Sequence, residues 1–150
     1  MQRTKRNSKR ERQDAVAQSL ATLLRVAEGL CVTIEPRPGD RNSFSARLST
    51  VFLSESIAGE RLLFTLAHEL GHAEQESEGF RGEVIDEACQ SSDVNSPGYS
   101  EAVDKSVCEK LEPDAWIRGQ RWIAPLLLSA YRERAKNCLA TYSLPSPFEG

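Results

Sequence analysis

The strongest helical pattern in the chain is ERLLFTLAHELGHAE, residues 60–74. Its apolar side chains recur at spacings of three and four residues, which is typical of a helix with one buried face. That face is formed by Leu63, Leu66, Ala67 and Leu70. The other expected elements lie on either side of this helix along the chain.

Ahead of this helix, the sequence predicts another helix and a few short strands. Apolar residues at helical spacing predict a helix over 14–28, and Gly29 ends it. Short β-type runs then predict a strand at 30–34 and one or two more strands within 44–53. A helix followed by a small hairpin or sheet is therefore expected to precede the central helix.

Beyond the central helix, the pattern is weaker. Residues 75–99 contain Gly, Ser, Asn and Pro among many acids, so we expect an acidic, irregular insertion there. Shorter helices are expected over 100–111, from about Pro113 onward, and over 125–142. Residues 143–150 are expected to form a C-terminal loop.

The size and composition are those of one globular domain. The chain has 150 residues, a formal net charge of −3 and 39% hydrophobic residues. Its basic N-terminus has no apolar stretch behind it, and no apolar run reaches the ~20 residues that span a bilayer, so we expect a cytoplasmic protein without a membrane partner. Four scattered cysteines without a C-x-x-C pair argue against a cysteine-rich zinc module. The domain is expected to cover 14–142, after a basic, flexible tail over 1–13.

Both histidines of the chain lie in one motif, His68-Glu69-Leu70-Gly71-His72. Residues four apart share a helix face, so the two imidazoles can bind one Zn²⁺ ion. Glu69 beside the first histidine can take a proton from a water on that metal. The alternative is a helix that contains two histidines without a metal. The motif uses every histidine and lies within the strongest helix, which favours one Zn²⁺ per chain.

A third protein ligand must be a carboxylate or a thiolate, because the chain has no third histidine. In a helix that starts near Glu112, this residue lies at the edge of an apolar stripe, where an unpaired carboxylate would be costly. The alternative is that Glu112 only caps its helix. Glu101 is the rival ligand, although it lies away from the apolar stripe of its own predicted helix, and Glu109 is a weaker third choice.

Several of these segments are similar to a known family. Residues 63–72 resemble the active-site helix of the ImmA/IrrE family of small bacterial and phage metallopeptidases. Residues 112–119, EPDAWIRG, resemble the second-ligand helix of some members, and residues 138–142 resemble a C-terminal pattern in the same members. The preceding helix and hairpin also follow the order of elements in that family. The resemblance covers roughly 14–142, and only its HELGH segment is specific.

The resemblance implies a fold, a ligand set and an activity. The implied fold is a minimal zincin-like α+β domain with an N-terminal helix, a small β-hairpin or sheet, the HExxH helix and C-terminal helices. In the implied site, His68, His72 and Glu112 hold zinc, and Glu69 is the general base. The long acidic gap before Glu112 departs from the family and keeps Glu101 open as the third ligand. Since members cleave helix-turn-helix repressors, the implied partner is a protein substrate, a transcriptional repressor of a phage, a mobile element or a stress response.

The sequence therefore predicts a zinc endopeptidase and leaves two alternatives open. One is a catalytically silent, metal-stabilised regulatory binding module, against which the presence of Glu69 argues. The other is a nucleic-acid binder. Because the basic N-terminal tail has no aromatic residue and the rest of the chain is acidic, we expect nucleic acid to bind only weakly there. Tyr99, Tyr131 and Tyr142 could each assist the carbonyl oxygen, and the sequence singles out none of them.

Overall fold

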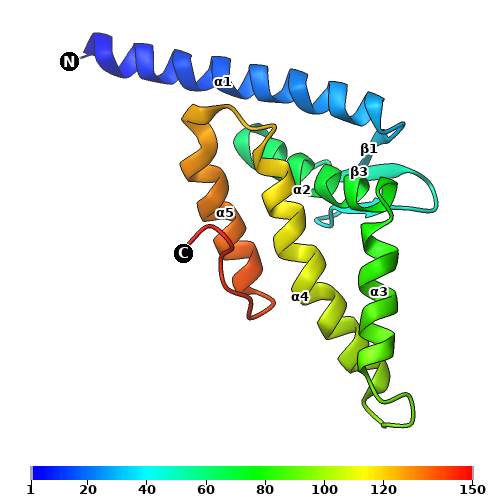
Figure 1. Ribbon diagram of the computed structural model, residues 1–150. Coiled ribbons are helices and arrows are strands. Elements are labelled where there is room, and N and C mark those ends of the chain that lie inside the picture. Colours follow the sequence, from blue (N-terminus) through cyan, green and yellow to red (C-terminus); the bar gives the residue numbers. More distant parts are fainter. Residues whose placement is uncertain (1, 150) are drawn as a thin grey trace.

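The computed structural model describes residues 2–149, with side chains from residue 8 onward. Over this part of the chain it is an α+β domain with one three-stranded sheet (Figure 1). In chain order, the elements are α1 (Gln2–Gly29), β1 (Thr33–Arg37), β2 (Ser43–Ser45), β3 (Thr50–Ser54), α2 (Gly59–Ser77), α3 (Phe80–Ser91), α4 (Tyr99–Gln120), the 3₁₀ helix η1 (Pro125–Leu127) and α5 (Leu128–Ala140). The α+β class expected from the sequence is confirmed.

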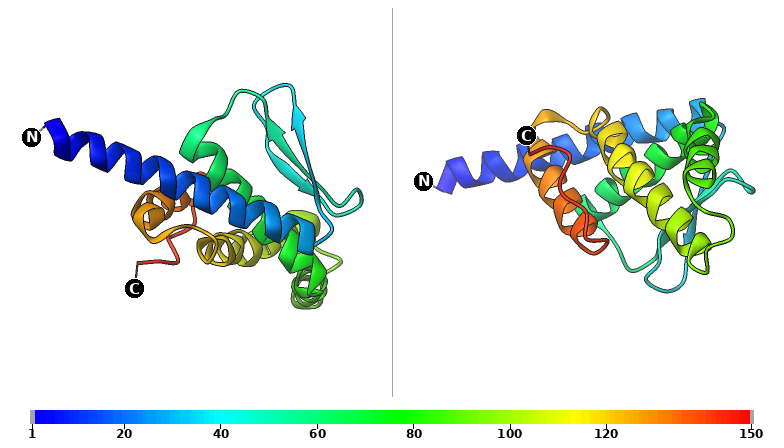
Figure 2. Two further views of the ribbon diagram at one scale, coloured as in Figure 1. Left: turned by 90° about the horizontal axis from the view of Figure 1, so that it is seen from above. Right: turned by 60° about the horizontal axis from the view of Figure 1, so that its bottom comes forward.

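The sheet has the strand order β1-β3-β2, with β3 parallel to β1 and antiparallel to β2. The strand predicted at 30–34 is displaced, since β1 begins only at Thr33. Cys31 has a φ of 57° in the turn that follows α1, which keeps that part of the chain out of the sheet. β1 also contains Pro36, which an edge strand tolerates. Seen from above, the sheet lies on one side of α1, and α4 and α5 lie on the other (Figure 2).

The N-terminal helix begins at Gln2, so the boundary predicted between a flexible tail and a helix at residue 14 is wrong. The first residues include several arginines and lysines, which are good helix formers, and they contain no glycine or proline. Residue 1 and the side chains of residues 2–7 lie outside the described residues, so only part of the predicted basic tail can be placed. Within the described part, Arg12 pairs with Glu60 at the start of α2, at 2.6 Å.

The central helix α2 buries the apolar face that its sequence predicts. Each residue of that face is at most 1% exposed: Leu63, Leu66, Ala67 and Leu70. α2 is covered by α1 on one side, by β3 on another and by α4 on a third. The helix that carries the motif therefore lies at the centre of the fold, and the neighbouring elements surround its polar residues.

Helices α2 and α4 cross with their backbones in close approach. A Cβ atom on Gly71 of α2 would lie 2.9 Å from the carbonyl carbon of Ala115 and closer still to its oxygen. A Cβ atom on Gly119 of α4 would lie 2.8 Å from the carbonyl oxygen of Ala67. Glycines on both helices therefore permit the crossing. Gly71 directly precedes His72, and Gly119 faces Ala67, which directly precedes His68.

The region from 75 to 112 is more regular than its composition suggests. The acidic insertion expected at 75–99 contains the end of α2 and all of α3, and only 78–79 and 92–98 lie outside helices. α3 forms because Val84 and Ala88, four residues apart, are buried where it packs on α2 and α4. The two short helices expected around Pro113 are one continuous helix, α4. Burial of its apolar side chains offsets the backbone hydrogen bond that proline cannot donate.

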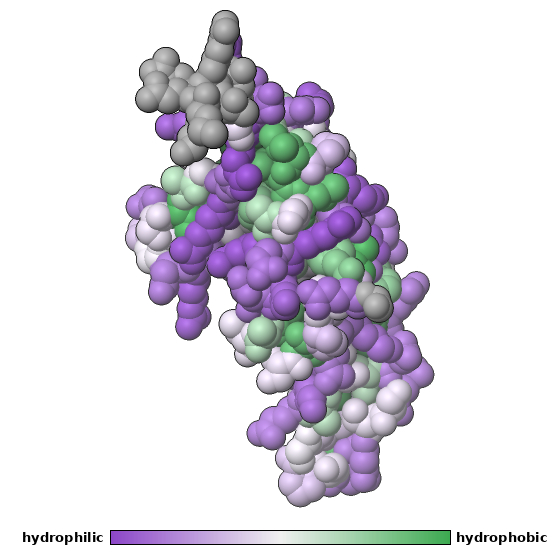
Figure 3. Space-filling view, turned by 90° about the vertical axis from the view of Figure 1, so that its left-hand side faces the viewer, coloured by the Kyte–Doolittle hydropathy of each residue, from purple (hydrophilic) through white to green (hydrophobic). Residues whose placement is uncertain are grey.

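The C-terminal part packs back on the same core. α5 ends at Ala140, and it buries Tyr131, Ala135 and Leu139. The chain then turns back along α5 (Figure 1), where Phe148 lies near Tyr131 with ring centroids 6.4 Å apart. On the side of the molecule that carries this segment, small apolar patches interrupt a mostly polar surface (Figure 3). Within residues 2–149, no helix has the length and apolar character needed to cross a membrane.

Candidate metal centre

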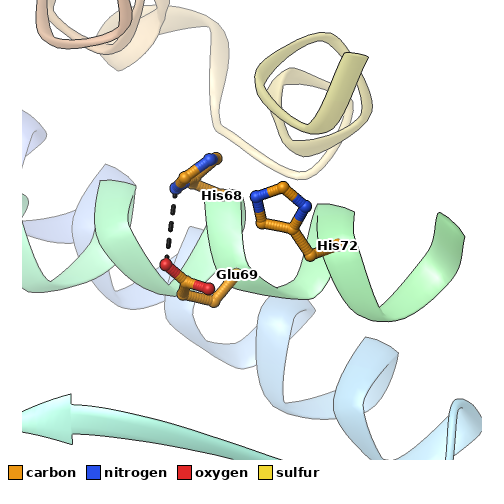
Figure 4. Close-up of side chains that lie close together, drawn as sticks. All are labelled: His68, Glu69 and His72. Atoms are coloured by element: carbon orange, nitrogen blue, oxygen red, sulfur yellow. Dashed lines mark ion pairs between the residues drawn. The ribbon is translucent and has the colours of Figure 1, made fainter. Parts of the chain in front are cut away.

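α2 presents His68 and His72 side by side, and Glu69 lies next to His68 (Figure 4). The imidazole rings of the two histidines have centroids 4.7 Å apart, as expected for residues one helical turn apart. One ligand atom from each of the three side chains lies within 4.8 Å of the others. The Glu69 carboxylate lies 3.5 Å from Nδ1 of His68. This group could hold a metal ion.

Glu112 approaches the two histidines from α4. Its Oε2 lies 2.9 Å from Nε2 of His68, and its Oε1 lies 3.3 Å from Nε2 of His72. In a tetrahedral site with ligand bonds of ~2.0–2.1 Å, neighbouring ligand atoms lie about 3.3 Å apart. Both separations are close to that spacing, and a donor set of two imidazoles and one carboxylate suits a divalent transition metal.

The two other carboxylates considered from the sequence lie elsewhere. Glu101 is exposed in the first turn of α4, eleven residues before Glu112, which corresponds to roughly 16 Å along a helix. Glu109 is exposed as well, and it lies 3.9 Å from Lys105. Of the three candidates, Glu112 is the one that the fold brings to the histidines.

The electrostatics of this site favour a positive charge between the side chains. Burial disfavours the charged carboxylate, yet hydrogen bonds with His68 and His72 hold the pKa of Glu112 well below its ordinary value. Burial also opposes the charged form of His72, but the Glu112 carboxylate outweighs it and raises the pKa of that imidazole. A cation bound between these groups would meet the same attraction.

Gln75 fixes the orientation of His72. This side chain is 0% exposed, and its amide nitrogen donates hydrogen bonds of 2.9 Å to the carbonyl of Leu111 and to Asp114. Its amide oxygen must therefore face Nδ1 of His72, which lies 2.9 Å away and donates to it. Because Gln75 holds the proton on Nδ1, Nε2 is the nitrogen that faces Glu112 and that would give up its proton to bind a metal ion.

Sequence reasoning did not single out Gln75. The signal that could have found it is its position seven residues after His68 and three after His72, on the same face of α2. An amide on a buried helix face needs partners, and these come from α4.

Arg118 extends this network across the two helices. It donates to Asp114 at 2.5 Å, to Glu74 at 2.9 Å and to Glu78 at 2.7 Å. Burial would lower the pKa of Arg118, but the three carboxylates raise it above its ordinary value. Because Asp114 also accepts from Gln75, the ion pairs of Arg118 help to hold the support of His72 in place.

The first histidine is held by an aromatic neighbour. The ring of His68 stacks on Trp116 of α4, with centroids 4.3 Å apart and an angle of 8° between the planes. Trp116 is 3% exposed, and its carbonyl accepts a hydrogen bond of 2.6 Å from the hydroxyl of Tyr131. This tyrosine therefore has a structural role in the core, away from solvent.

Two hollows meet at the candidate centre, and both are lined by His68, Glu69 and Glu112. The larger, of about 400 Å³, extends past Phe44 of β2, and the smaller, of about 200 Å³, extends along α5. Tyr142 lines both hollows and is 55% exposed. The negative charge of Glu112 and, to a lesser degree, burial raise the pKa of Tyr142. Of the three tyrosines, this is the one that lines the two hollows at the candidate centre.

Comparisons with known protein families, with curated proteins and with solved structures find no significant match for this chain. The resemblance to the ImmA/IrrE family therefore stays a prediction from the residues. The function must be argued from the geometry of the candidate centre.

Proposed function

We propose that this chain is a zinc-dependent endopeptidase of the ImmA/IrrE type, which hydrolyses a peptide bond in a protein substrate. The observation that carries the proposal is the position of Glu112, which is 44 residues from His68 in the chain and faces both histidines. Three protein ligands beside an open hollow are typical of catalytic zinc sites, whereas structural sites are closed by four. The resemblance of residues 63–72 makes a helix-turn-helix repressor the proposed substrate.

Glu69 is the proposed general base and acid. When bound, zinc polarises the scissile carbonyl and lowers the pKa of a bound water to about 7. Glu69 lies one residue after a ligand and lines both hollows, so its carboxylate can accept the proton of the attacking water. A bond then forms between the water oxygen and the carbonyl carbon. Glu69 returns the proton to the amide nitrogen as the carbon–nitrogen bond breaks.

Tyr142 is the proposed partner of the carbonyl oxygen. Tyr142 lines both hollows and a tyrosine hydroxyl is protonated at neutral pH, so it can donate a hydrogen bond as negative charge develops on that oxygen. The other two tyrosines do not suit this role. Tyr131 is buried and already donates to Trp116, and Tyr99 lies at the far end of α4.

Zinc content tests the metal centre directly. The full chain is purified without added metal, and bound metals are quantified beside those of Glu112→Ala and Glu101→Ala. Glu101 is the matched control because it is an exposed carboxylate of the same helix. We expect about one zinc per chain in the wild type and in Glu101→Ala, and a strong loss in Glu112→Ala. Equal zinc content in the two variants would contradict the ligand assignment.

Replacing Glu69 with glutamine tests catalysis separately from metal binding. The variant should retain zinc, because none of the ligands changes, and its hydrolysis of a peptide library, read by mass spectrometry, should fall by ~10²–10⁴-fold. Cleavage at the wild-type rate would rule out Glu69 as the base. If the zinc-loaded wild type cleaves no peptide or repressor protein, the metal-stabilised binding module becomes the better account of the function.

A further inference from the structure

Arg134 of α5 and Arg118 of α4 are both half-buried, but their surroundings differ. The Nε atom of Arg134 is buried and has no hydrogen-bond partner within residues 8–149. Arg118, by contrast, pairs with three carboxylates. A buried guanidinium nitrogen without a partner costs free energy, so an arginine left in this state is expected to meet its partner in a complex.

The position of Arg134 relates it to the candidate centre. It lines the smaller hollow, together with His68 and Glu69 of the motif. Cys138 lies one helical turn further on and lines the same hollow, as does Tyr142 in the turn after α5, so this side of α5 faces the candidate centre. The positive charge of Arg134 also opposes the effect of burial, which raises the pKa of the Cys138 thiol.

The charge balance of the smaller hollow leaves Arg134 uncompensated. Its acidic residues are Glu69 and Glu112, and both belong to the proposed metal centre. With a divalent cation bound, these two carboxylates balance the charge of the metal, and the guanidinium keeps its own charge. A hollow of about 200 Å³ has room for a side chain or a chain end rather than for a folded surface.

We infer that Arg134 binds a carboxylate of the substrate next to the scissile bond and thereby selects substrates that carry one there. A guanidinium binds carboxylates with two parallel hydrogen bonds, and the Nε atom of Arg134 has no partner of its own within residues 8–149. The carboxylate is either an Asp or Glu side chain or the C-terminal end of a peptide. This inference rests on the proposed function, because it assigns part of the substrate site of the same centre.

The test uses two small hydroxamates that differ in one group. The hydroxamate end binds zinc in both, and the other end is a carboxylate in succinic acid monohydroxamate and an uncharged primary amide in its analogue. Affinities for the full, zinc-loaded chain are measured by titration calorimetry. We expect the wild type to bind the carboxylate compound about tenfold more tightly, because a charged hydrogen bond is gained.

Variants of α5 assign that preference to one side chain. Arg134→Gln is expected to remove it, and Arg134→Lys to retain part of it, with zinc content unchanged in both. Arg132→Gln is the matched control, since Arg132 is exposed on the same helix, and it should keep the full preference. A preference that survives in Arg134→Gln would overturn the inference.

Two further outcomes separate this inference from the proposed function. A wild-type chain that holds zinc but binds both hydroxamates equally refutes the Arg134 subsite alone. A chain that takes up no zinc refutes the proposed function and the subsite together.

The source of the carboxylate is settled by two dipeptide hydroxamates. One carries a glutamate side chain and an amidated C-terminus, and the other carries glutamine and a free C-terminus. Tighter binding of the first assigns the subsite to an acidic side chain, and tighter binding of the second assigns it to a chain end. In either case the difference must disappear in Arg134→Gln, and its persistence would overturn the inference.

Discussion

Replacing Gly71 with alanine is expected to push α2 and α4 apart and to weaken both folding and metal binding. The added Cβ atom would lie 2.9 Å from the carbonyl carbon of Ala115 and 3.0 Å from its Cα atom. These are backbone atoms inside a helix, so no side chain can rotate away to make room. The helices themselves must separate by several tenths of an ångström.

The cost follows from two opposing effects. Overpacking of this kind typically destabilises a protein by ~1–3 kcal/mol. Alanine is intrinsically better in a helix than glycine by ~1 kcal/mol, which offsets part of that cost. Gly82→Ala is the matched control, because Gly82 lies in α3 and a Cβ atom there would meet nothing within 4 Å. The difference between the two variants therefore isolates the packing cost, which we expect to be ~2–3 kcal/mol because the obstacle is backbone.

Separation of the helices also affects the candidate centre. Glu112 lies on α4, and its oxygens lie 2.9 Å and 3.3 Å from the two histidine nitrogens on α2. Urea unfolding of the metal-free chain measures the change in the free energy of unfolding, and competition with a zinc chelator measures the change in zinc affinity. If Gly71→Ala and Gly82→Ala changed stability alike, or if Gly71→Ala bound zinc as tightly as the wild type, the close crossing would not position the ligands.

Three further perturbations test other parts of the structure. Gln75→Met leaves Nδ1 of His72 without its acceptor, so zinc affinity measured by chelator competition should fall ~10–100-fold; an unchanged affinity would mean that Gln75 only packs. In the metal-free chain, the raised pKa of His72 stabilises the fold fully at pH values below 6.5, and the lowered pKa of Glu112 stabilises it fully at pH values above 4.5. Urea midpoints should therefore be highest between pH 4.5 and 6.5, and they should fall at higher pH as His72 loses its proton. Zinc should remove this decline, and a metal-free midpoint that keeps rising to pH 8 would contradict the assignment. Arg12→Ala breaks an exposed ion pair with Glu60, so it should cost less than about 1 kcal/mol and less still in high salt; a larger, salt-independent loss would show that packing matters there.

The helix that the sequence did not predict is α3, which lies in a segment expected to be irregular. Polar and charged residues slightly outnumber the apolar ones in α3, so local composition is a weak signal for a helix. The few apolar residues there, such as Val84 and Ala88, are buried only because two other helices lie against them. Contacts between distant segments thus overrode the local signal, and the same holds for Pro113 within α4.

The candidate site likewise depends partly on local sequence and partly on contacts between distant segments. The sequence by itself determined that His68 and His72 share one helix face and that Glu69 follows the first of them, because helical periodicity is a local property of the chain. It also supplied Glu112 as a candidate, but it left Glu101 and Glu109 open. Only the crossing of α2 and α4, which Gly71 and Gly119 permit, brings Glu112 to the histidines.

Only the tertiary structure placed Gln75, Tyr142 and Arg134 around that centre. Their partners and neighbours lie on other elements, 36 residues away for the bond between Gln75 and Leu111. No periodicity within one segment encodes such distances. The sequence therefore determined the chemistry available on α2, and the packing of α4 and α5 against it decided which further side chains surround that chemistry, because those positions depend on contacts between segments far apart in the chain.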